Sequence, residues 1–249
     1  MELTGKTAVI TGGAHRVGKA ITLALAQAGA NVVINYNRSS TAAEATVAEA
    51  RALGVDALAV QANIADHKQV EAMINAAGER FSSLDVLINN ASLYQQTPFP
   101  TDNLDNWHRV TRILIDGAFY TANAVAPYML RQGNGVIINI VDLAAWQPWP
   151  GFAAHSVGKA GLLALTRQLA LELAPTVRVN AIAPGPVMPP PDYSEAEIAV
   201  AAERTLLNRW GHAKDVSNTV LFLVNSDFIT GDVITVDGGE RYGHRKSHN

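Results

Sequence analysis

A glycine-rich turn is the first feature of this sequence whose residue types and spacing suggest chemistry. A short apolar run ends at Thr11, and Gly12-Gly13-Ala14-His15-Arg16-Val17-Gly18 follows before a helical pattern begins. Glycine permits a tight turn and close approach of the backbone to a phosphate, and a helix N-terminus favours an anion. An ordinary strand–helix turn is the alternative, but the position after the first apolar run favours a dinucleotide site. The residues expected to contact the cofactor here are Gly12, His15, Arg16 and Val17.

The end of the second apolar run indicates which dinucleotide binds. Its sequence is Asn35-Tyr36-Asn37-Arg38-Ser39-Ser40, without a carboxylate. An NAD site usually has an Asp or Glu about 20 residues after the glycine turn, where it binds the ribose hydroxyls. Arg38 offers a guanidinium to a 2′-phosphate, and Ser39 and Ser40 offer hydroxyl donors. Arg38 as a solvated surface charge is the alternative, and the sequence predicts NADP(H) rather than NAD(H).

Short apolar, β-branched runs alternate with alanine-rich helical patterns along the chain, and these elements must position the candidate residues. Continuous apolar runs are typical of strands buried on both faces, and strand–helix alternation implies right-handed crossovers in a parallel sheet. The predicted strands are Thr7–Thr11, Val32–Tyr36, Ala57–Gln61, Val86–Asn90, Val136–Val141, Val177–Ile182 and Val233–Asp237. The sequence therefore predicts a single-domain, Rossmann-type, doubly wound α/β fold: a parallel seven-stranded sheet with helices on both faces. This domain spans residues 1–240, and a polar C-terminal tail spans 241–249.

Composition limits the classes of function. Apolar residues make up 48% of the 249 residues and charged residues 16%, which argues against disorder, and a net charge of -3 gives no indication of a nucleic-acid partner. The absence of cysteine excludes disulfides, thiolate zinc sites and a cysteine nucleophile. We expect no required metal, because the acids are scattered and His244 and His248 of the tail are weak ligand candidates. Without a signal-peptide pattern or a membrane-length apolar run, we expect a cytoplasmic protein with no membrane partner.

The chain resembles the short-chain dehydrogenase/reductase superfamily almost end to end. Besides the glycine turn, the resemblance rests on Asn89-Asn90-Ala91-Ser92, Asn139, Pro184-Gly185 and Val236-Asp237-Gly238-Gly239. Within that superfamily it is most similar to the pteridine reductases. They share Arg16 in place of the usual second glycine, the Arg38-Ser39 pair, a stretch like 89–98, and Asp142 where most relatives have the catalytic serine. This resemblance implies an NADPH-dependent oxidoreductase that reduces a pterin-like C=N bond or a carbonyl.

The resemblance also implies further site residues. Asn63 stands where an Asp usually contacts the adenine amine, and its side-chain carbonyl can accept that hydrogen bond. Tyr94 matches an aromatic residue that stacks on the pterin ring, with a half-buried loop aromatic as the alternative. The implied cofactor residues are Asn63, Ile64, Asn90, Ala91, Ser92, Lys159, Pro184, Gly185 and Val187. The implied substrate residues are Arg16, Ser92, Tyr94, Asp142 and His155.

The sequence departs from the family at the proton donor. The family's Tyr-x-x-x-Lys is His155-Ser156-Val157-Gly158-Lys159 here, and Leu114 occupies the place of a supporting Asn. An imidazole can act as a general acid near neutral pH, and Asp142 could orient it, which makes Asp142, His155 and Lys159 the candidate catalytic residues. A His155 that only lines a pocket stays open. Two other functions also stay open: a non-catalytic NADP(H)-binding relative, and a reductase of 3-oxoacyl or sugar carbonyls.

The resemblance finally implies a homotetramer or homodimer. The helix predicted from about Lys159 to Leu173 has apolar residues around much of its circumference, so more than one face needs burying. Its leucines are Leu162, Leu163, Leu165, Leu169 and Leu171. The aromatic residues Trp146, Trp149 and Phe152 before it are interpreted either as an apolar pocket wall or as core or subunit packing.

Overall fold

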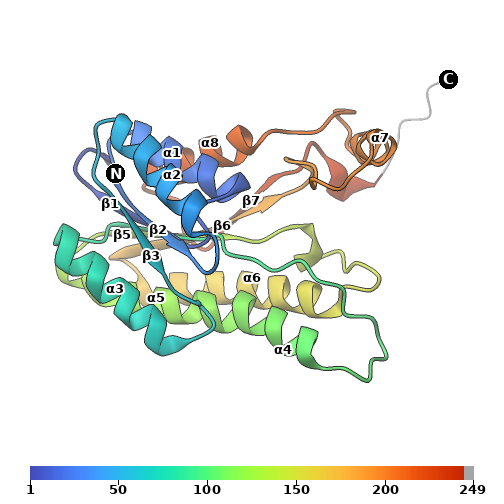
Figure 1. The fold of residues 1–249 in the computed structure, drawn as a ribbon, viewed down its shortest axis with the longest axis horizontal. Coiled ribbons are helices and arrows are strands. Elements are labelled where there is room, and N and C mark those ends of the chain that lie inside the picture. The colour runs from blue at the N-terminus through green and yellow to red at the C-terminus, as the bar shows by residue number, and fades with distance from the viewer. Residues whose placement is uncertain (244–249) are drawn as a thin grey trace.

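The centre of the molecule is a parallel sheet of seven strands in the order β3-β2-β1-β4-β5-β6-β7 (Figure 1). The structure is a computed structural model that describes residues 1–243; 244–249, with His244 and His248, lie outside the described residues. The strands are β1 (Thr7–Ile10), β2 (Asn31–Tyr36), β3 (Ala57–Gln61), β4 (Val86–Asn89), β5 (Gly135–Ile140), β6 (Val177–Pro184) and β7 (Val233–Val236). This confirms the predicted fold class, and strand ends differ from the predicted ones by about one or two residues.

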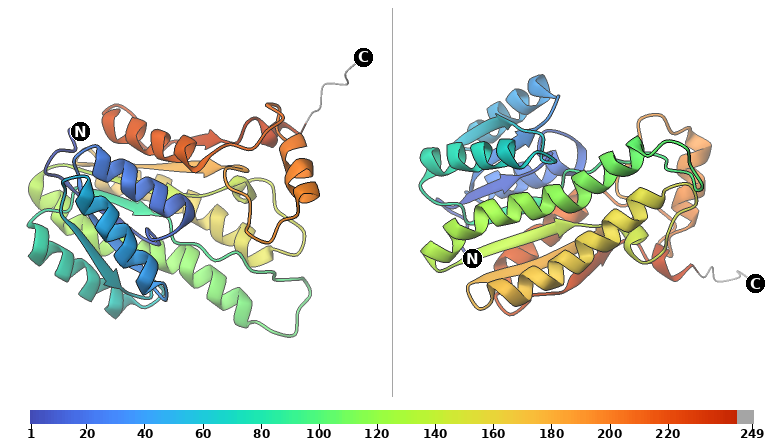
Figure 2. Two further views of the ribbon diagram at one scale, coloured as in Figure 1. Left: turned by 45° about the horizontal axis from the view of Figure 1, so that its top comes forward. Right: turned by 90° about the horizontal axis from the view of Figure 1, so that it is seen from below.

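Helices cover both faces of the sheet, as predicted (Figures 1 and 2). On one face lie α1 (Arg16–Gln27), α2 (Ser40–Ala52) and α8 (Ala213–Asn225). On the other lie α3 (His67–Phe81), α4 (Asp105–Thr111), α5 (Gly117–Gln132) and α6 (Ala153–Leu173). The π turn η1 (Arg112–Asp116) joins α4 to α5, and α7 (Glu195–Glu203) lies beyond the end of the sheet. No helix within residues 1–243 is both long and apolar enough to cross a membrane.

The central strands are buried along their whole length. Every residue of β1, β4 and β5 is buried, because helices cover these strands on both sides. Burying one Val, Leu or Ile side chain contributes about 1.5–3 kcal/mol, so these strands form a rigid support. Their carboxyl ends are the fixed points from which the functional loops extend.

The strand order reverses next to β1. Strand β1 pairs with β2 on one side and with β4 on the other, both in parallel register. The connections after β1 and β4 therefore lead to opposite faces of the sheet and leave a crevice between them. In doubly wound folds this crevice at the carboxyl ends is where ligands bind.

Two segments near the crevice differ in detail from the expectations. Helix α6 begins at Ala153, about six residues before the predicted start, so His155 and Lys159 lie one turn apart on the same helix. The proline-rich segment after β6 is a loop, and β6 itself continues through Pro184. A short 3-10 turn, η2 (Leu143–Ala145), follows β5 directly.

Candidate active site

A cleft of about 1360 Å³ lies at the carboxyl ends of the strands. It is larger than the roughly 300–1,000 Å³ of most small-molecule sites. One wall consists of the glycine turn and the loops after β2 and β3, and the other of the loop after β4 together with α4 and η1. The cleft brings together these predicted residues: Gly12, His15, Arg16, Val17, Arg38, Ser39, Asn63, Ile64, Asn90, Ala91, Ser92 and Tyr94.

The glycine turn favours glycine at two positions, at one because of its backbone conformation and at the other because a side chain has no room. Gly12 has a φ of 62°, in the left-handed region that favours glycine. A Cβ on Gly18 would lie 2.2 Å from the Gly12 carbonyl oxygen and 2.6 Å from Asn90 Nδ2. The backbone of the turn therefore stays open toward the N-terminus of α1, as a dinucleotide site requires.

Two nitrogen-bearing side chains at this wall are available to a ligand. Within residues 1–243, the side chains of His15 and Arg38 have no hydrogen bond or ion pair. Both line the cleft: His15 belongs to the glycine turn, and Arg38 lies in the loop between β2 and α2. These groups fit the phosphates of NADP(H), and Asn63 lines the same wall with its Oδ1 accepting from Ala65 N at 3.1 Å.

Arg16 has a second contact that the sequence did not suggest. Its φ of 49° lies in the left-handed region, which is uncommon for a residue other than glycine. The guanidinium donates hydrogen bonds to the carbonyl oxygens of Met188 at 2.8 Å and Pro189 at 3.2 Å. Arg16 therefore lines the cleft and also ties the glycine turn to the loop after β6.

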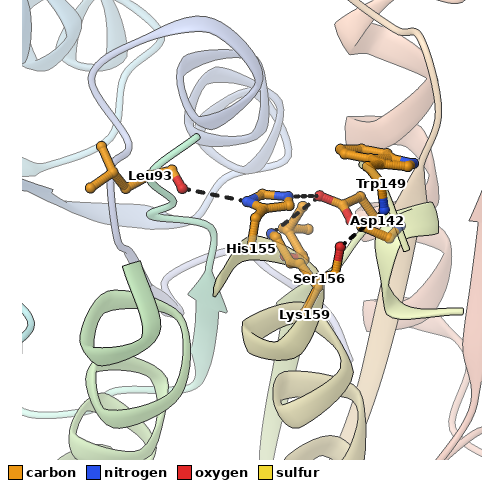
Figure 3. Close-up of polar contacts among 8 residues, drawn as sticks. Leu93, Asp142, Trp149, His155, Ser156 and Lys159 are labelled. Atoms are coloured by element: carbon orange, nitrogen blue, oxygen red, sulfur yellow. Dashed lines mark hydrogen bonds and ion pairs between the residues drawn. The ribbon is translucent and has the colours of Figure 1, made fainter. Parts of the chain in front are cut away.

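The three candidate catalytic side chains form one cluster at the end of β5 (Figure 3). Asp142 caps η2 by accepting a hydrogen bond from Ala144 N at 3.0 Å. His155 Nε2 lies 2.7 Å from Asp142 Oδ2. Lys159 Nζ lies 3.9 Å from the same oxygen and donates to the Ile140 carbonyl at 2.8 Å. Asp142 thus bridges the imidazole and the ammonium group.

The electrostatics of the cluster favour a charged Asp142. Burial by itself raises the pKa of Asp142, but the charge of Lys159 and the hydrogen bond from His155 outweigh it, so the pKa lies below its ordinary value. Burial lowers the pKa of Lys159, and the Asp142 charge opposes part of that shift. Asp142 is therefore a carboxylate at neutral pH, and it accepts the Nε2–H hydrogen bond of His155.

Aromatic rings cover His155, whose exposed fraction is only 2%. The Trp149 ring stacks on the imidazole with centroids 5.6 Å apart, and Tyr94 meets it edge-on at 5.3 Å. Phe152 stacks on the other side of Tyr94 at 4.4 Å. Tyr94 itself is 59% exposed and lines the cleft, so it lies between His155 and the cleft space. Trp149 and Phe152 therefore pack around His155 and Tyr94, and neither lines the cleft itself.

Several predicted site residues lie outside the cleft lining. The lining does not include Asp142, His155 and Lys159. Their polar atoms bind one another and the backbone instead. Ser40 is the first residue of α2, and Pro184 ends β6. A Cβ on Gly185 would lie 2.8 Å from Asp237, and Val187 lines a separate cavity of about 200 Å³.

Other residues at the site were missed by the sequence analysis. The Leu93 carbonyl lies 3.4 Å from His155 Nδ1, a backbone contact that no side-chain pattern could indicate (Figure 3). Leu114, at the place of the family's Asn, is buried, and its side chain fills the space that a Cβ on Gly158 would need. One face of α4 and η1 also lines the cleft, with Asp105, His108, Arg109 and Arg112. Their spacing of three or four residues is typical of one face of a helix, so the sequence alone could have indicated that they lie together.

The described part of the chain contains no group of three or more His, Asp or Glu side chains that could hold a metal ion.

Comparisons with known proteins show the family. Residues 12–240 match the family described as enoyl-(acyl carrier protein) reductase. A 3-oxoacyl-[acyl-carrier-protein] reductase of Synechocystis sp. is 40% identical over 242 residues, which cover 95% of this chain and 97% of that protein. The corresponding Staphylococcus aureus reductase is 39% identical over 246 residues, which cover 96% and 99%. The chain belongs to the short-chain dehydrogenase/reductase superfamily.

Solved structures agree with this assignment. The FolM alternative dihydrofolate reductase 1 from Brucella canis, complexed with NADP, is 30% identical with a TM-score of 0.92, covering 99% of this chain and 98% of that one. A blue fluorescent protein from a metagenomic library, in complex with NADPH, is 32% identical with a TM-score of 0.89, covering 96% and 99%. The superfamily prediction is confirmed. The narrower resemblance is not, because the curated relatives above are 3-oxoacyl reductases rather than pteridine reductases.

Proposed function

We propose that this protein is an NADP(H)-dependent reductase in which Asp142, His155 and Lys159 deliver a proton to a C=N or carbonyl group of a flat, pterin-like substrate. The observation that carries the proposal is the 2.7 Å contact between His155 Nε2 and Asp142 Oδ2. A carboxylate that orients an imidazole is a chemically suitable arrangement for proton transfer. The cluster lies directly behind a residue of the cleft wall, Tyr94.

The cofactor assignment is supported by the cleft and by its relatives. In this proposal Arg38 binds the 2′-phosphate, and the glycine turn with His15 binds the pyrophosphate, which is supported by their all lining the cleft. Two similar solved structures contain NADPH or NADP by their descriptions. When bound, the cofactor supplies the hydride, and the protein contributes orientation and proton handling.

The two ring nitrogens of His155 have different roles in this proposal. Asp142 holds the Nε2–H hydrogen, which leaves Nδ1 as the nitrogen that exchanges a proton with the substrate. The contact of Nδ1 with the Leu93 carbonyl, at 3.4 Å, is long for a hydrogen bond and therefore weak. The Asp142 carboxylate lies between the imidazole and the Lys159 ammonium group, with its Oδ2 2.7 Å from His155 Nε2 and 3.9 Å from Lys159 Nζ.

The flat substrate is supported by the aromatic wall and by one relative. Tyr94 is exposed to the cleft and lies beside His155, so a ring stacked on it would place its reducible bond near the imidazole. One similar structure is described as an alternative dihydrofolate reductase, and dihydrofolate contains a pterin ring. Lys159 acts in this proposal as a buried positioning charge that keeps Asp142 ionised.

Two further candidates each have a supporting observation. The 40% and 39% identical relatives favour reduction of a 3-oxoacyl thioester. The 2% exposure of His155 favours a relative that binds NADP(H) without turnover, because a proton donor must reach its substrate.

A homo-oligomer is proposed as well, since Phe119, Val157 and Leu171 expose apolar surface on α5 and α6.

The test is NADPH oxidation by the purified protein with dihydrobiopterin, a quinonoid dihydropterin and a 3-oxoacyl thioester. We expect turnover with a pterin, and a loss of about 10²–10⁴-fold in kcat for His155→Ala, the usual contribution of a general acid. Fluorescence titration with NADPH should give the same affinity for both proteins. His67→Ala on α3, outside the cleft, is the matched control and should keep full activity.

Other outcomes select the other candidates. Turnover of the thioester alone would favour the 3-oxoacyl reductase. A wild-type protein that binds NADPH without turning over any acceptor, together with a gain of activity in His155→Tyr, would identify a relative that has lost its acid. Full activity in His155→Ala would remove His155 from the mechanism.

A further inference from the structure

The segment formed by α4 and η1 has two sides with different chemistry. On one side, Trp107, Val110 and Leu114 pack with Leu93 and Ala154 in a small apolar cluster. This packing fixes the rotation of the segment about its axis. The opposite side is therefore turned toward the cleft in a defined orientation.

The cleft side of the segment carries Asp105, His108, Arg109 and Arg112, which follow the helical spacing i, i+3, i+4 and i+7. Neither arginine side chain has a hydrogen bond or an ion pair within residues 1–243, and both are exposed. Asp105 is the one carboxylate among the described residues that line the cleft. Two neighbouring guanidinium groups repel each other, so an anion that contacts both is favoured there.

The proposed function assigns the phosphate groups of the cofactor to the wall opposite α4 and η1. Helices α1 and α2 lie in the layer above the sheet in Figure 1, whereas α4 lies in the layer below it. His15 directly precedes α1, and Arg38 lies in the loop that leads to α2. The α4 wall instead continues into the loop that carries Tyr94, because Asn106 Nδ2 donates to the Gln96 carbonyl at 3.2 Å. At about 1360 Å³, the cleft also exceeds the roughly 300–1,000 Å³ of an ordinary ligand site.

We propose that Arg109 and Arg112 form an anion subsite for a carboxylate or phosphate at the end of the substrate remote from the reducible group. The proposal rests on the proposed function and narrows its substrate class to molecules with an acidic extension. A pterin with a glutamate extension and an acyl thioester on a phosphopantetheine arm share this chemistry. A compact, uncharged carbonyl compound lacks it.

The test compares two matched ligand pairs by calorimetric titration of the NADP⁺-saturated protein. One pair is pteroylglutamate and its dimethyl ester; the other is acetoacetyl-phosphopantetheine and acetoacetyl-pantetheine. The variants are Arg109→Gln/Arg112→Gln and, as a control, Lys68→Gln/Lys214→Gln, which removes the same charge outside the cleft. Thermal unfolding of each variant confirms that it is folded.

We expect the arginine variant to bind the acidic member of one pair about tenfold more weakly, the sum of two exposed ion pairs, with the neutral member unaffected. Arg109→Lys/Arg112→Lys should recover part of the affinity, and added salt should shrink the difference. The pair that responds identifies the source of the anion. The lysine control should leave all affinities unchanged.

Three outcomes overturn the proposal: equal affinity for the acidic ligand in wild type and the arginine variant, a loss of NADPH affinity instead, or no binding by any of the four ligands. The anion subsite and the proposed function can be rejected independently of each other. Extension-dependent binding without turnover would keep the subsite and reject the reductase, whereas turnover without dependence on the extension would do the reverse.

Discussion

The cofactor wall and the proton-transfer cluster of this protein are built in different ways. At the cofactor wall the backbone conformation of one turn makes the site, and Arg38 and His15 face the cleft without partners. In the cluster behind Tyr94, Asp142 and His155 bind each other, and His155 is screened from solvent. The first region is open and ready for a ligand, whereas the second is already satisfied by its own contacts.

The two regions rest on different elements of the fold. The glycine turn depends on β1 and α1, whereas the cluster depends on β5, η2 and α6. In the cluster, Leu114 packs against Gly158 and Trp149 packs against the imidazole of His155. Binding and turnover are therefore expected to respond to different substitutions.

The largest expected effect is a loss of NADPH affinity caused by a substitution in the glycine turn. In Gly18→Ala the new Cβ meets the Gly12 carbonyl at 2.2 Å, so the turn must shift. NADPH affinity should fall about 100-fold, equivalent to about 3 kcal/mol, the upper range for overpacking. Fluorescence titration measures it. Gly161→Ala is the control, because there the Cβ meets only the Ile115 side chain at 3.1 Å, and an unchanged affinity in Gly18→Ala would contradict the assignment of the turn.

A smaller effect tests the choice of dinucleotide. Arg38→Gln should weaken NADPH binding about tenfold, near the value of one charge-assisted pair at an accessible site, while NADH binding stays the same. Titration with both dinucleotides measures the preference, with Arg167→Gln on α6 as a matched loss of charge. Equal losses for the two dinucleotides would show that Arg38 does not bind the 2′-phosphate.

The smallest effect concerns the buried cluster and its pH dependence. The pKa of Asp142 in the folded protein lies below its ordinary value of 3.8, so between the two values the unfolded chain binds more protons. The carboxylate therefore contributes stability above about pH 3.8, and this contribution is lost as pH falls through the folded pKa. In Asp142→Asn the free energy of unfolding should fall less steeply over that range, as measured by urea unfolding at several pH values. Asp102→Asn, an exposed acid, is the control, and parallel curves for Asp142→Asn and wild type would contradict the shift.

The sequence by itself determined the sheet, the glycine turn and the cofactor preference. The strands were predictable because each is a continuous apolar run, and Ala57–Gln61 has the predicted bounds. The turn was predictable because glycine is required where a Cβ cannot fit, as at Gly18. The lack of a carboxylate after β2 is likewise a local property. All three depend on residues close together in the chain.

Only the tertiary structure decided which of the candidate side chains face the cleft. His155 and Asp142 were predicted as a pair, but the cover of Trp149 and Tyr94 and the contact with the Leu93 carbonyl come from two other segments, the loop after β4 and the loop before α6. The same holds for the arginines of α4 and η1, which face the cleft because Trp107 on the opposite side packs in a small apolar cluster. Such contacts depend on how whole elements pack, and side-chain burial follows from that packing rather than from neighbours in the sequence.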